Sequence, residues 1–373
     1  TEMEIREPER LTPVVAEADV VVVGSGPGGL SAAIAAARAG VSVILIERFG
    51  CFGGNITSVG VEGFAWYRHK KTIEAGGLAF EYEQRAIENN AAVPESQSKS
   101  YELDSEAFKV VADNLVLEAG VRPMLHRAFC SPILEGNEIK GVITESKAGR
   151  EAIMGKIIID ATGDADVARR SGVTVFKNSK EDMISASVMF HMSGVNKEEF
   201  MDEIKRDPQK YSDWSDKNWQ VQTSGKEDDM FSPFLRKPFE KAKDAGLIDS
   251  DLQTISGTWG AIHDSGELTY LNLVHLNGID GTDPESLTKG EIEGRKAALE
   301  AIAALKEYMP GCSAGKLRNF GMTIGIRDTY KIDSEYNLSD EDVKNECRFD
   351  DSIGIYPEFI DGFGILVLPT TGR

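Results

Sequence analysis

Along the sequence, apolar residues are concentrated between residues 19 and 48, where they form three blocks. Four valines at 20–23 predict a buried strand, an alanine-rich run that ends at Gly40 predicts a helix, and the apolar run 43–46 predicts a second strand. A glycine-rich turn, 24–29, connects the first strand to the helix. This order predicts a βαβ unit, whose two strands lie parallel.

Shorter patterns of the same two kinds follow along the chain. Helical spacing of apolar residues covers 72–90 and 104–119, where Asp104 predicts an N-cap and Gly120 a stop. The other predicted elements are strands over 121–129, 131–135, 139–146, 152–159, 319–326, 353–360 and 365–368, a tight turn at Asn137, and a long helix over 290–309.

The middle third of the chain differs in character, because charge runs, several prolines and two nearby tryptophans gather there. We therefore predict two domains. One is discontinuous and consists of residues 1–175 and 305–373, and the other is inserted and consists of residues 176–304. Trp214 and Trp219 belong either to a substrate lid or to a packed loop, and the packed loop is favoured.

Length and charge narrow the class of protein. A chain of 373 residues can bury a large core. Its formal net charge of −20 disfavours a nucleic-acid partner, since the acidic surface repels phosphate. No apolar run approaches the roughly 20 residues that span a bilayer. The four cysteines are widely spaced, so we expect reduced thiols, a cytoplasmic protein and no metal site.

The glycine turn predicts a dinucleotide site. Gly24 permits the tight turn, Gly26 lets the backbone approach a pyrophosphate, and Gly29 lets helix and strand pack closely. The phosphates would then lie at the positive end of the helix, together with Pro27 and Gly28. Glu47 ends the second strand, where its carboxylate is expected to accept hydrogen bonds from a ribose diol.

Two later segments favour FAD over NAD. The glycine-rich continuation after Glu47 suits a loop that passes under a pyrophosphate and a flavin ring; an ordinary turn is the alternative. An apolar strand then runs into a second stretch of small residues, where Asp166 either caps a helix or meets a ribityl or phosphate-bound water. The candidate FAD residues in these segments are Arg48, Gly53, Gly54, Asn55, Thr57, Ala161, Thr162, Gly163 and Asp166.

These motifs together resemble the FAD-dependent oxidoreductase family of glutathione-reductase-type flavoproteins, related to the flavin domains of fumarate reductase and heterodisulfide reductase. The resemblance extends through 277–283, 291–295 and 325–329, which are more specific to the family than the first motif. It implies an α/β fold with a Rossmann-type FAD-binding domain and an inserted α+β substrate domain. It also implies that Phe129 lies beside the adenine, although plain core packing explains Phe129 equally well.

The same resemblance raises the question of a partner. Related proteins continue into another flavin segment and a C-terminal helix that closes over the ring, whereas this sequence ends at Arg373. We therefore expect either a second polypeptide that supplies this segment or a shortened chain. We also expect the protein to form an oligomer.

Candidate catalytic residues come from the second half of the chain. Arg327 follows a predicted strand and is expected to stabilise reduced flavin or to anchor a carboxylate, with a salt bridge to a nearby aspartate as the alternative. Tyr330 is a candidate proton donor or a packing residue. His275 and His191 alternate with apolar residues and are candidate general bases, ahead of His69, although a structural role is more common for any one histidine.

The sequence thus predicts an enzyme, an FAD-dependent dehydrogenase or reductase. It would transfer hydride between a small organic substrate and N5 of FAD, and an external electron acceptor or donor would complete the cycle. Two alternatives stay open. One is an FAD-binding or electron-relay subunit that needs a partner chain, and the other is a thiazole-synthase-like, non-redox use of the bound dinucleotide.

Overall fold

The structure is a computed structural model of the chain. The residues that it describes are 3–63, 76–94, 101–210, 215, 220–223, 233–345, 347–353, 360–362 and 365–368. They group into two compact units. The first consists of Thr1–Phe52 and Ala112–Val175, and the second of Gly53–Val111 and Phe176–Arg373. The domain limits predicted from the sequence stay a prediction.

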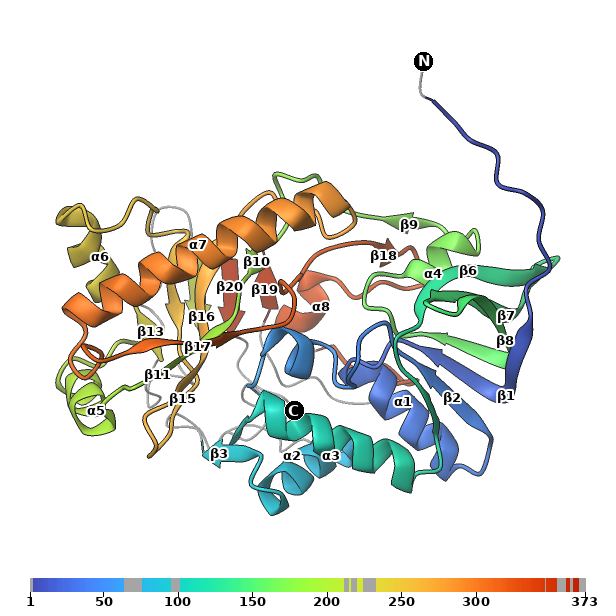
Figure 1. Cartoon of the computed structure of the whole chain (residues 1–373), viewed down its shortest axis with the longest axis horizontal. Helices are drawn as coiled ribbons and strands as arrows, with labels where there is room; N and C mark the ends of the chain where they lie inside the picture. Colours follow the sequence, from blue (N-terminus) through green and yellow to red (C-terminus); the bar gives the residue numbers. More distant parts are fainter. Residues whose placement is uncertain are drawn as a thin grey trace. The chain divides into compact units, whose positions relative to one another are not determined.

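The first unit is built on a six-stranded mixed sheet (Figure 1). Its central strand, β1 (Val14–Val23), pairs in parallel with β2 (Val43–Ile46) and with β8 (Gly149–Asp160). Strand β5 (Arg122–Met124) lies parallel to β2 at one edge. On the other side β7 (Glu138–Ser146) pairs antiparallel with β8, and β6 (Ala128–Glu135) pairs antiparallel with β7. The helices of this unit are α1 (Pro27–Arg38) and α4 (Asp166–Arg170).

The predicted βαβ unit is confirmed, because β1, α1 and β2 follow one another and Val20–Val23 pair in register with Val43–Ile46. The single strand predicted over 121–129 is wrong. Its residues form two strands, β5 and β6, which lie at opposite edges of the sheet, and His126 between them has a φ of +58°. The tight turn predicted at Asn137 is confirmed; its first residue, Gly136, has a φ of +60°.

The second unit has its own sheet, in the order β13-β14-β16-β11-β17, with β10 and β15 also paired to β16. The long helix α7 contacts β16 along this sheet (Figure 1). The strands are β10 (Ala186–Ser187), β11 (Phe190–Ser193), β13 (Phe234–Leu235), β14 (Ile255–Thr258), β15 (Ala261–Ile262), β16 (Leu268–Leu276) and β17 (Lys316–Phe320).

The remaining helices and strands complete the described chain. The helices are the π-helix η1 (Asn55–Val59), α2 (Gly77–Glu88), α3 (Ser105–Glu118), α5 (Lys197–Arg206), α6 (Lys237–Asp244), α7 (Pro284–Tyr308) and α8 (Asp340–Lys344). The strands are β3 (Ala92–Pro94), β4 (Tyr101–Leu103), β9 (Val175–Phe176), β12 (Gln220–Thr223), β18 (Lys331–Ile332), β19 (Ile360–Gly362) and β20 (Ile365–Leu368).

Capping residues set the limits of two predicted helices. Asp104 caps α3 as predicted, since its Oδ1 accepts hydrogen bonds from the amides of Glu106 and Ala107. Helix α7 begins at Pro284, six residues before its predicted start. The side chain of Asp283 accepts from the amide of Glu285, so an N-cap followed by proline starts the helix there.

In the last third of the chain, the structure confirms one predicted strand and shortens another. The strand predicted over 319–326 ends at Phe320. Gly321 after it packs closely against the carbonyl of Val59, and only Gly325 pairs again, in an isolated bridge with Ser187. The strand over 365–368 is confirmed. Most of the strand predicted over 353–360, and both Trp214 and Trp219, lie outside the described residues.

Each unit buries an apolar core of its own. In the first unit Val21, Ile44 and Ile153 come from three adjacent strands and are almost fully buried. In the second unit the aromatic rings of Phe200 and Trp259 meet edge to face with centroids 5.2 Å apart. Burial of such side chains is the main stabilising contribution to a fold of this size.

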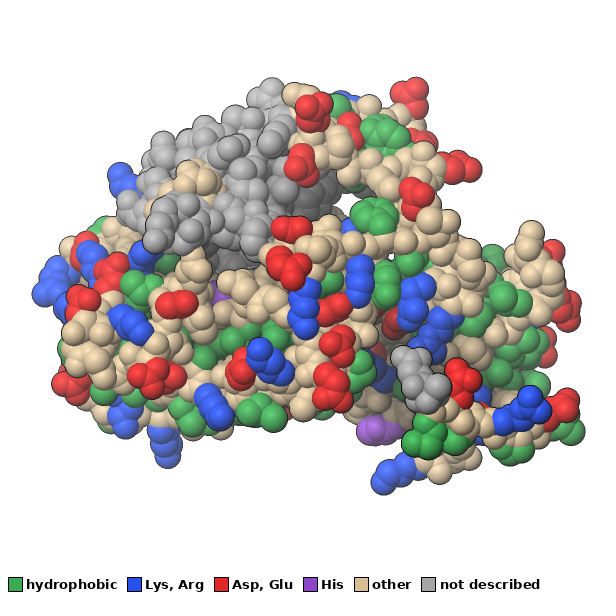
Figure 2. Space-filling model, turned by 90° about the horizontal axis from the view of Figure 1, so that it is seen from above, with side chains coloured by type: hydrophobic (Ala, Val, Ile, Leu, Met, Phe, Trp, Pro, Cys, Tyr) green, Lys and Arg blue, Asp and Glu red, His purple; other side chains and the backbone are tan. Residues whose placement is uncertain are grey.

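On the face drawn in Figure 2, acidic side chains are interspersed with basic ones over the described residues. Among the described helices, none combines the length and the apolar composition that a membrane crossing requires.

The first prediction concerns the packing of α1 on β1. A Cβ at Gly29 would lie 1.9 Å from the carbonyl oxygen of Gly24, whereas one at Gly28 would meet nothing within 4 Å. Gly29→Ala is therefore expected to destabilise the protein by about 2 kcal/mol or more. Gly28→Ala, the matched control in the same turn of helix, should leave stability unchanged or slightly raised. Urea denaturation followed by circular dichroism measures both; equal midpoints for the two variants would contradict the packing argument.

Candidate functional site

The glycine turn between β1 and α1 is held by close backbone contacts. Gly24 has a φ of +96°, and a Cβ there would lie 2.3 Å from the carbonyl oxygen of Ala161. The amide of Ala161 in turn donates to the carbonyl of Val23 at 2.9 Å. Only glycine permits both this dihedral angle and this approach. The turn therefore lies directly against the end of β8.

The other side of the turn is open. A Cβ at Gly26 or at Gly28 would meet no atom within 4 Å. Gly26 is the N-cap of α1, no side chain caps the helix, and Pro27 follows at the first helical position. The amides of the first turn and the positive end of the helix thus face open space. This geometry fits a pyrophosphate, as the sequence predicted.

Glu47 braces the turn from the end of β2. Its side chain is buried, and Oε2 accepts hydrogen bonds from the amide of Ser25 at 3.0 Å and from the Ser25 hydroxyl at 2.6 Å. Oε1 accepts from the amide of Phe49 at 2.9 Å. Since each carboxylate oxygen accepts up to two hydrogen bonds, capacity for a ribose hydroxyl remains. Contact of Glu47 with a ribose stays a prediction, and the contribution of Ser25 was missed from the sequence.

A second polar network lies at the end of β8. Asp160 Oδ1 accepts from the amide and hydroxyl of Thr162, and Oδ2 accepts from the amide of Ala168 at 2.9 Å. The capping role considered for Asp166 is wrong, because Ala165 occupies the N-cap of α4 and Asp166 is its first helical residue. The small residues Ala161, Thr162 and Gly163 form the loop between them, and their contact with FAD stays a prediction.

Two other candidates of the first unit make cation–π contacts. The guanidinium of Arg48 lies 4.5 Å from the ring centroid of Phe49. Phe129 packs against the core of the first unit, and the guanidinium of Arg170 lies 5.7 Å from its ring centroid. Core packing thus explains part of the environment of Phe129, and its place beside an adenine stays a prediction.

The glycine-rich continuation forms an unusual turn in the second unit. Gly53 and Gly54 have φ values of +113° and +53°, and the five residues from Asn55 form the π-helix η1. The side chain of Thr57 is buried under Gly53, while Asn55 is exposed. Single turns of π-helix are rare and are frequently found at functional sites. This is consistent with the flavin loop that the sequence predicts here.

Arg327 is available to a ligand. Its exposed guanidinium donates to the carbonyl of Ser185 and to Asn272 Oδ1, both at 3.3 Å. The alternative was a salt bridge to Asp328 or Asp333. Asp328 pairs with Lys331 instead, and among the described residues Arg327 forms no ion pair with Asp333. Tyr330 lies under the ammonium of Lys177, 5.1 Å from its ring centroid.

His275 lies on β16, and the positive charge of Arg327 acts on its imidazole. Its Nδ1 is 3.3 Å from the hydroxyl of Ser187 on the neighbouring strand. Burial, and secondarily the charge of Arg327, lower the pKa of His275 to about 3. A neutral imidazole with a hydroxyl partner can accept a proton, but it holds that proton weakly.

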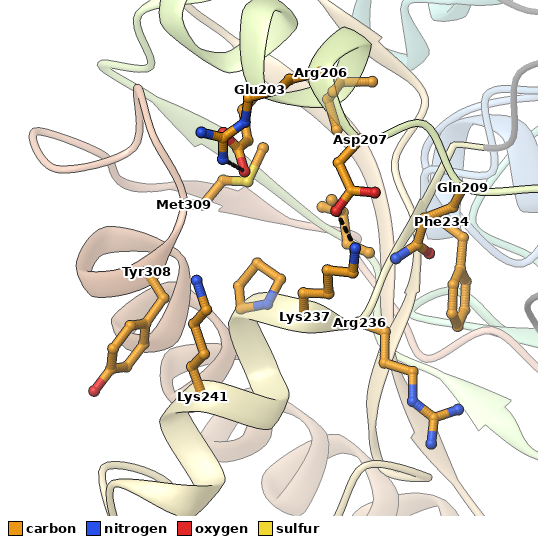
Figure 3. A pocket seen from close by; sticks show the side chains of 13 residues that line it. Glu203, Arg206, Asp207, Gln209, Phe234, Arg236, Lys237, Lys241, Tyr308 and Met309 are labelled. Carbon is orange, nitrogen blue, oxygen red and sulfur yellow. Dashed lines mark hydrogen bonds and ion pairs between the residues drawn. The ribbon is translucent and has the colours of Figure 1, made fainter.

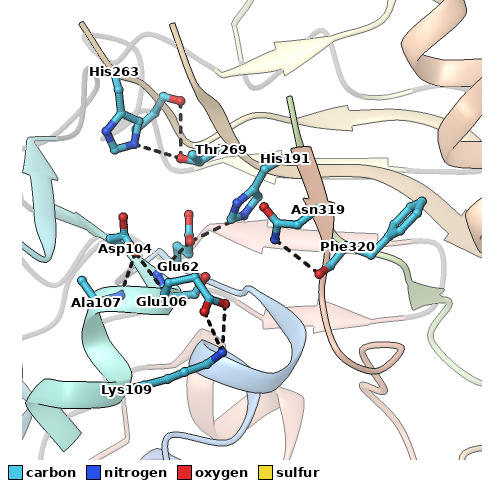
Figure 4. A network of polar contacts seen from close by, with 12 residues as sticks. Glu62, Asp104, Glu106, Ala107, Lys109, His191, His263, Thr269, Asn319 and Phe320 are labelled. Atoms are coloured by element: carbon cyan, nitrogen blue, oxygen red, sulfur yellow. Dashed lines mark hydrogen bonds and ion pairs between the residues drawn. The ribbon is translucent and has the colours of Figure 1, made fainter. Parts of the chain in front are cut away.

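His191 lies in a different environment, on β11. It is almost fully buried, and its Nε2 is 3.5 Å from Glu62 Oε1 (Figure 4). Burial lowers the pKa of His191 to about 4 and raises the pKa of Glu62 to about 7. Glu62 was missed from the sequence, since a lone glutamate before a glycine carries no local signal. His69 lies outside the described residues.

The geometry defines a dinucleotide-binding flavoprotein fold, and comparison with known proteins gives its family. Residues 19–361 match the family described as FAD dependent oxidoreductase. The chain belongs to this family, and its cofactor is FAD. The open glycine turn of the first unit fits the pyrophosphate of this cofactor.

Individual relatives are more distant. A thiamine thiazole synthase of Saccharolobus islandicus is 33% identical over 162 residues, which are 40% of this chain and 57% of the relative. The chain thus spans little more than half the length of the curated relatives that it matches. The structure of the myxobacterial chondrochloren halogenase CndH, described as an FAD-dependent halogenase, matches with a TM-score of 0.50 and 13% identity. This match covers 87% of the chain and 67% of CndH, and it shows the fold alone.

The second prediction follows from the raised pKa of Glu62. A carboxyl whose pKa is higher in the folded state stabilises fully below its unfolded pKa, and that stability is lost as pH rises through the folded pKa. A rise from 4.5 to about 7 corresponds to roughly 3 kcal/mol at most. Glu62→Gln should therefore gain stability over the wild type between pH 5 and pH 8.

Guanidinium denaturation at a series of pH values measures this difference. The matched control is Glu106→Gln, which removes an exposed carboxylate that is paired with Lys109 in the same cluster. It should follow the wild-type pH dependence. A constant difference between wild type and Glu62→Gln across this pH range would show that the Glu62 carboxyl titrates as it does in water.

Proposed function

We propose that this chain is an FAD-dependent dehydrogenase or reductase that acts on a small organic substrate. When bound, FAD supplies a two-electron carrier that accepts or gives a hydride at N5. The observation that carries the proposal is the open, uncapped turn at Gly26 and Gly28, held from behind by Glu47, in a chain of the FAD-dependent oxidoreductase family.

The residues of the chain have separate roles in this proposal. The turn from Gly24 to Gly29 binds the pyrophosphate, and Glu47 keeps it in place through Ser25. Arg327 binds an anionic group of the substrate or of the reduced cofactor, since its exposed guanidinium makes only two long hydrogen bonds to the described residues. His275 and His191 are the candidate bases, and Tyr330 is a candidate proton donor.

The electrons must leave through another molecule. We propose an external acceptor or donor, because the sequence contains one complete dinucleotide fingerprint. A second polypeptide that completes the flavin site, and an oligomeric assembly, also stay predictions. Mass spectrometry of the purified native complex tests the second polypeptide.

The relatives support one competing function. Thiamine thiazole synthases are 33% identical to 162 residues of this chain. A thiazole-synthase-like protein would use its bound dinucleotide without redox chemistry. The identity of the nucleotide released from the purified protein distinguishes the two, because only the oxidoreductase requires a flavin.

An FAD-binding or electron-relay subunit is the other alternative. Such a subunit would carry FAD but would not reduce it with any organic substrate unless its partner chain were present. This alternative and the oxidoreductase share the cofactor, so only a reduction experiment separates them.

The third prediction tests the proposed function directly. The purified protein should release FAD on denaturation, identified by chromatography. Mixed anaerobically with a panel of small alcohols, 2-hydroxy acids, amines and thiols, the holoprotein should lose its flavin absorbance with at least one compound. Release of a non-flavin nucleotide favours the thiazole-synthase-like, non-redox function. FAD that stays oxidised with every compound, but bleaches once a co-purified chain is added, favours the relay subunit.

The fourth prediction concerns the brace behind the turn. Glu47→Ala leaves the buried donors of Ser25 and Phe49 without their acceptor, which costs about 1–3 kcal/mol for each unsatisfied group. The turn should relax, and FAD should bind at least about tenfold more weakly. Fluorescence titration of the apoprotein with FAD measures this. Glu17→Ala on β1 removes an exposed carboxylate and is the control; equal FAD affinity in both variants would rule the brace out.

A further inference from the structure

A cavity lies within the second unit, where helices α5, α6 and α7 meet the short strand β13 (Figure 3). Helices α5 and α7 end at this cavity, and α6 begins there. Its volume is about 140 Å³. An engineered cavity of about 150 Å³ in another protein holds one benzene molecule, so this cavity has room for a ligand with a single ring.

The floor of the cavity is apolar. Ile204, Leu235 and Met309 line it, and each is at most 8% exposed. Pro238, in the first turn of α6, completes the floor and is also buried. Such side chains offer no partner to an ion, but they stabilise apolar surface that leaves water. The floor therefore favours a ligand that has an apolar body.

The rim of the cavity is charged. Two carboxylates and four cationic side chains line it: Glu203, Asp207, Arg206, Arg236, Lys237 and Lys241. Positive charge is thus in excess here, although the whole chain has a formal net charge of −20. The helix ends do not reverse this excess, since two negative ends and one positive end leave only about half a negative charge.

Three of the four cations already have an acidic partner. Arg206 and Lys237 pair with the two carboxylates of the rim. Arg236 pairs with Glu240, an acid of α6 that does not line the cavity. Such ion pairs are common on protein surfaces and need no ligand to explain them. The positive excess therefore comes from the fourth cation.

Lys241 is this fourth cation. Its ammonium forms no hydrogen bond and no ion pair with the described residues. Lys237 and Lys241 are four residues apart, so both extend from the same face of α6 (Figure 3). Because an ammonium has three donors, Lys237 keeps two after its bond to Asp207. The two lysines can therefore bind one anion together.

A second unused group lines the same cavity. Gln209 follows α5, and its Oε1 is enclosed without a hydrogen-bond partner among the described residues. A buried polar atom without a partner is rare in proteins and calls for a ligand, a water molecule or an ion. Rotation of the amide brings its NH₂ group to the same place, so Gln209 can also donate to an anion.

We propose that this cavity binds a small organic anion, a carboxylate whose apolar body is about one ring in size, with its charge on Lys241 and Lys237 and its body on the floor. A carboxylate suits the rim better than a phosphate does, because Glu203 and Asp207 repel the second negative charge of a phosphate. The site goes beyond the proposed function, since hydride transfer requires nothing from it.

The fifth prediction tests this site by NMR of holoprotein labelled with ¹³C at the methionine methyl groups. Benzoate is the probe, and the Met309 signal is identified by its loss in Met309→Leu. This signal should shift in a saturable way as benzoate is added, because a ring on the floor lies against Met309. The dissociation constant should be on the order of 1 mM, as is usual for ligands of so few atoms.

Variants of the lysines test where the charge is held. Lys241→Gln should weaken benzoate binding at least about threefold, whereas Lys241→Arg keeps the charge and should bind like the wild type. Lys205→Gln is the matched control, because it removes an exposed lysine of α5 that does not line the cavity. It should leave benzoate affinity unchanged. Equal affinity in Lys241→Gln and Lys205→Gln overturns the proposal.

Ligands that lack one part of benzoate complete the test. Benzamide keeps the ring without the charge, and acetate keeps the charge without the ring, so each should bind more weakly than benzoate. A Met309 signal that does not shift with benzoate overturns the site. A shift that inorganic phosphate produces as readily as benzoate overturns the organic carboxylate as its ligand. Since the Met309 methyl group reports on this cavity, the result does not depend on whether any compound reduces the flavin.

Discussion

The buried carboxylate of Glu47 is the contact on which the nucleotide turn depends. It gathers three donors, two from Ser25 and one from Phe49, and so connects the ends of β1 and β2. No side chain caps the helix that follows, so its first amides stay open to a ligand. Close packing of Gly24 on Ala161 then fixes the turn from the other side.

Glu62 is a second buried glutamate, and burial has a different effect on it. The amide of Ser105 donates to its Oε1, and hydrogen bonds from the hydroxyls of Ser105 and Thr269 also act to lower its pKa. Desolvation outweighs all three, so the pKa of Glu62 rises to about 7. Hydrogen-bond donors around a buried carboxyl therefore do not by themselves keep it ionised.

How far the sequence predicts this structure depends on the range of the forces involved. The βαβ unit and the cap of α3 at Asp104 were predictable, because strand, turn and cap signals act within a few residues. The start of α7 at Pro284 was also predictable, since Asp283 and Pro284 form a local N-cap and first-turn signal. The break at His126 and the neighbours of Glu62 were not, because both are imposed by segments far away in sequence.

His191 and His275 show that alternation with apolar residues along a strand does not by itself identify a catalytic histidine. His191 and His275 both lie on strands between apolar neighbours, as the pattern predicts, but one faces a carboxyl and the other a hydroxyl. Beside a hydroxyl, an imidazole that takes a proton must remain charged in a buried place. Beside Glu62 the same desolvation acts, and it lowers the pKa of His191 to about 4. Burial therefore keeps both imidazoles neutral at pH 7, whichever polar group each one faces.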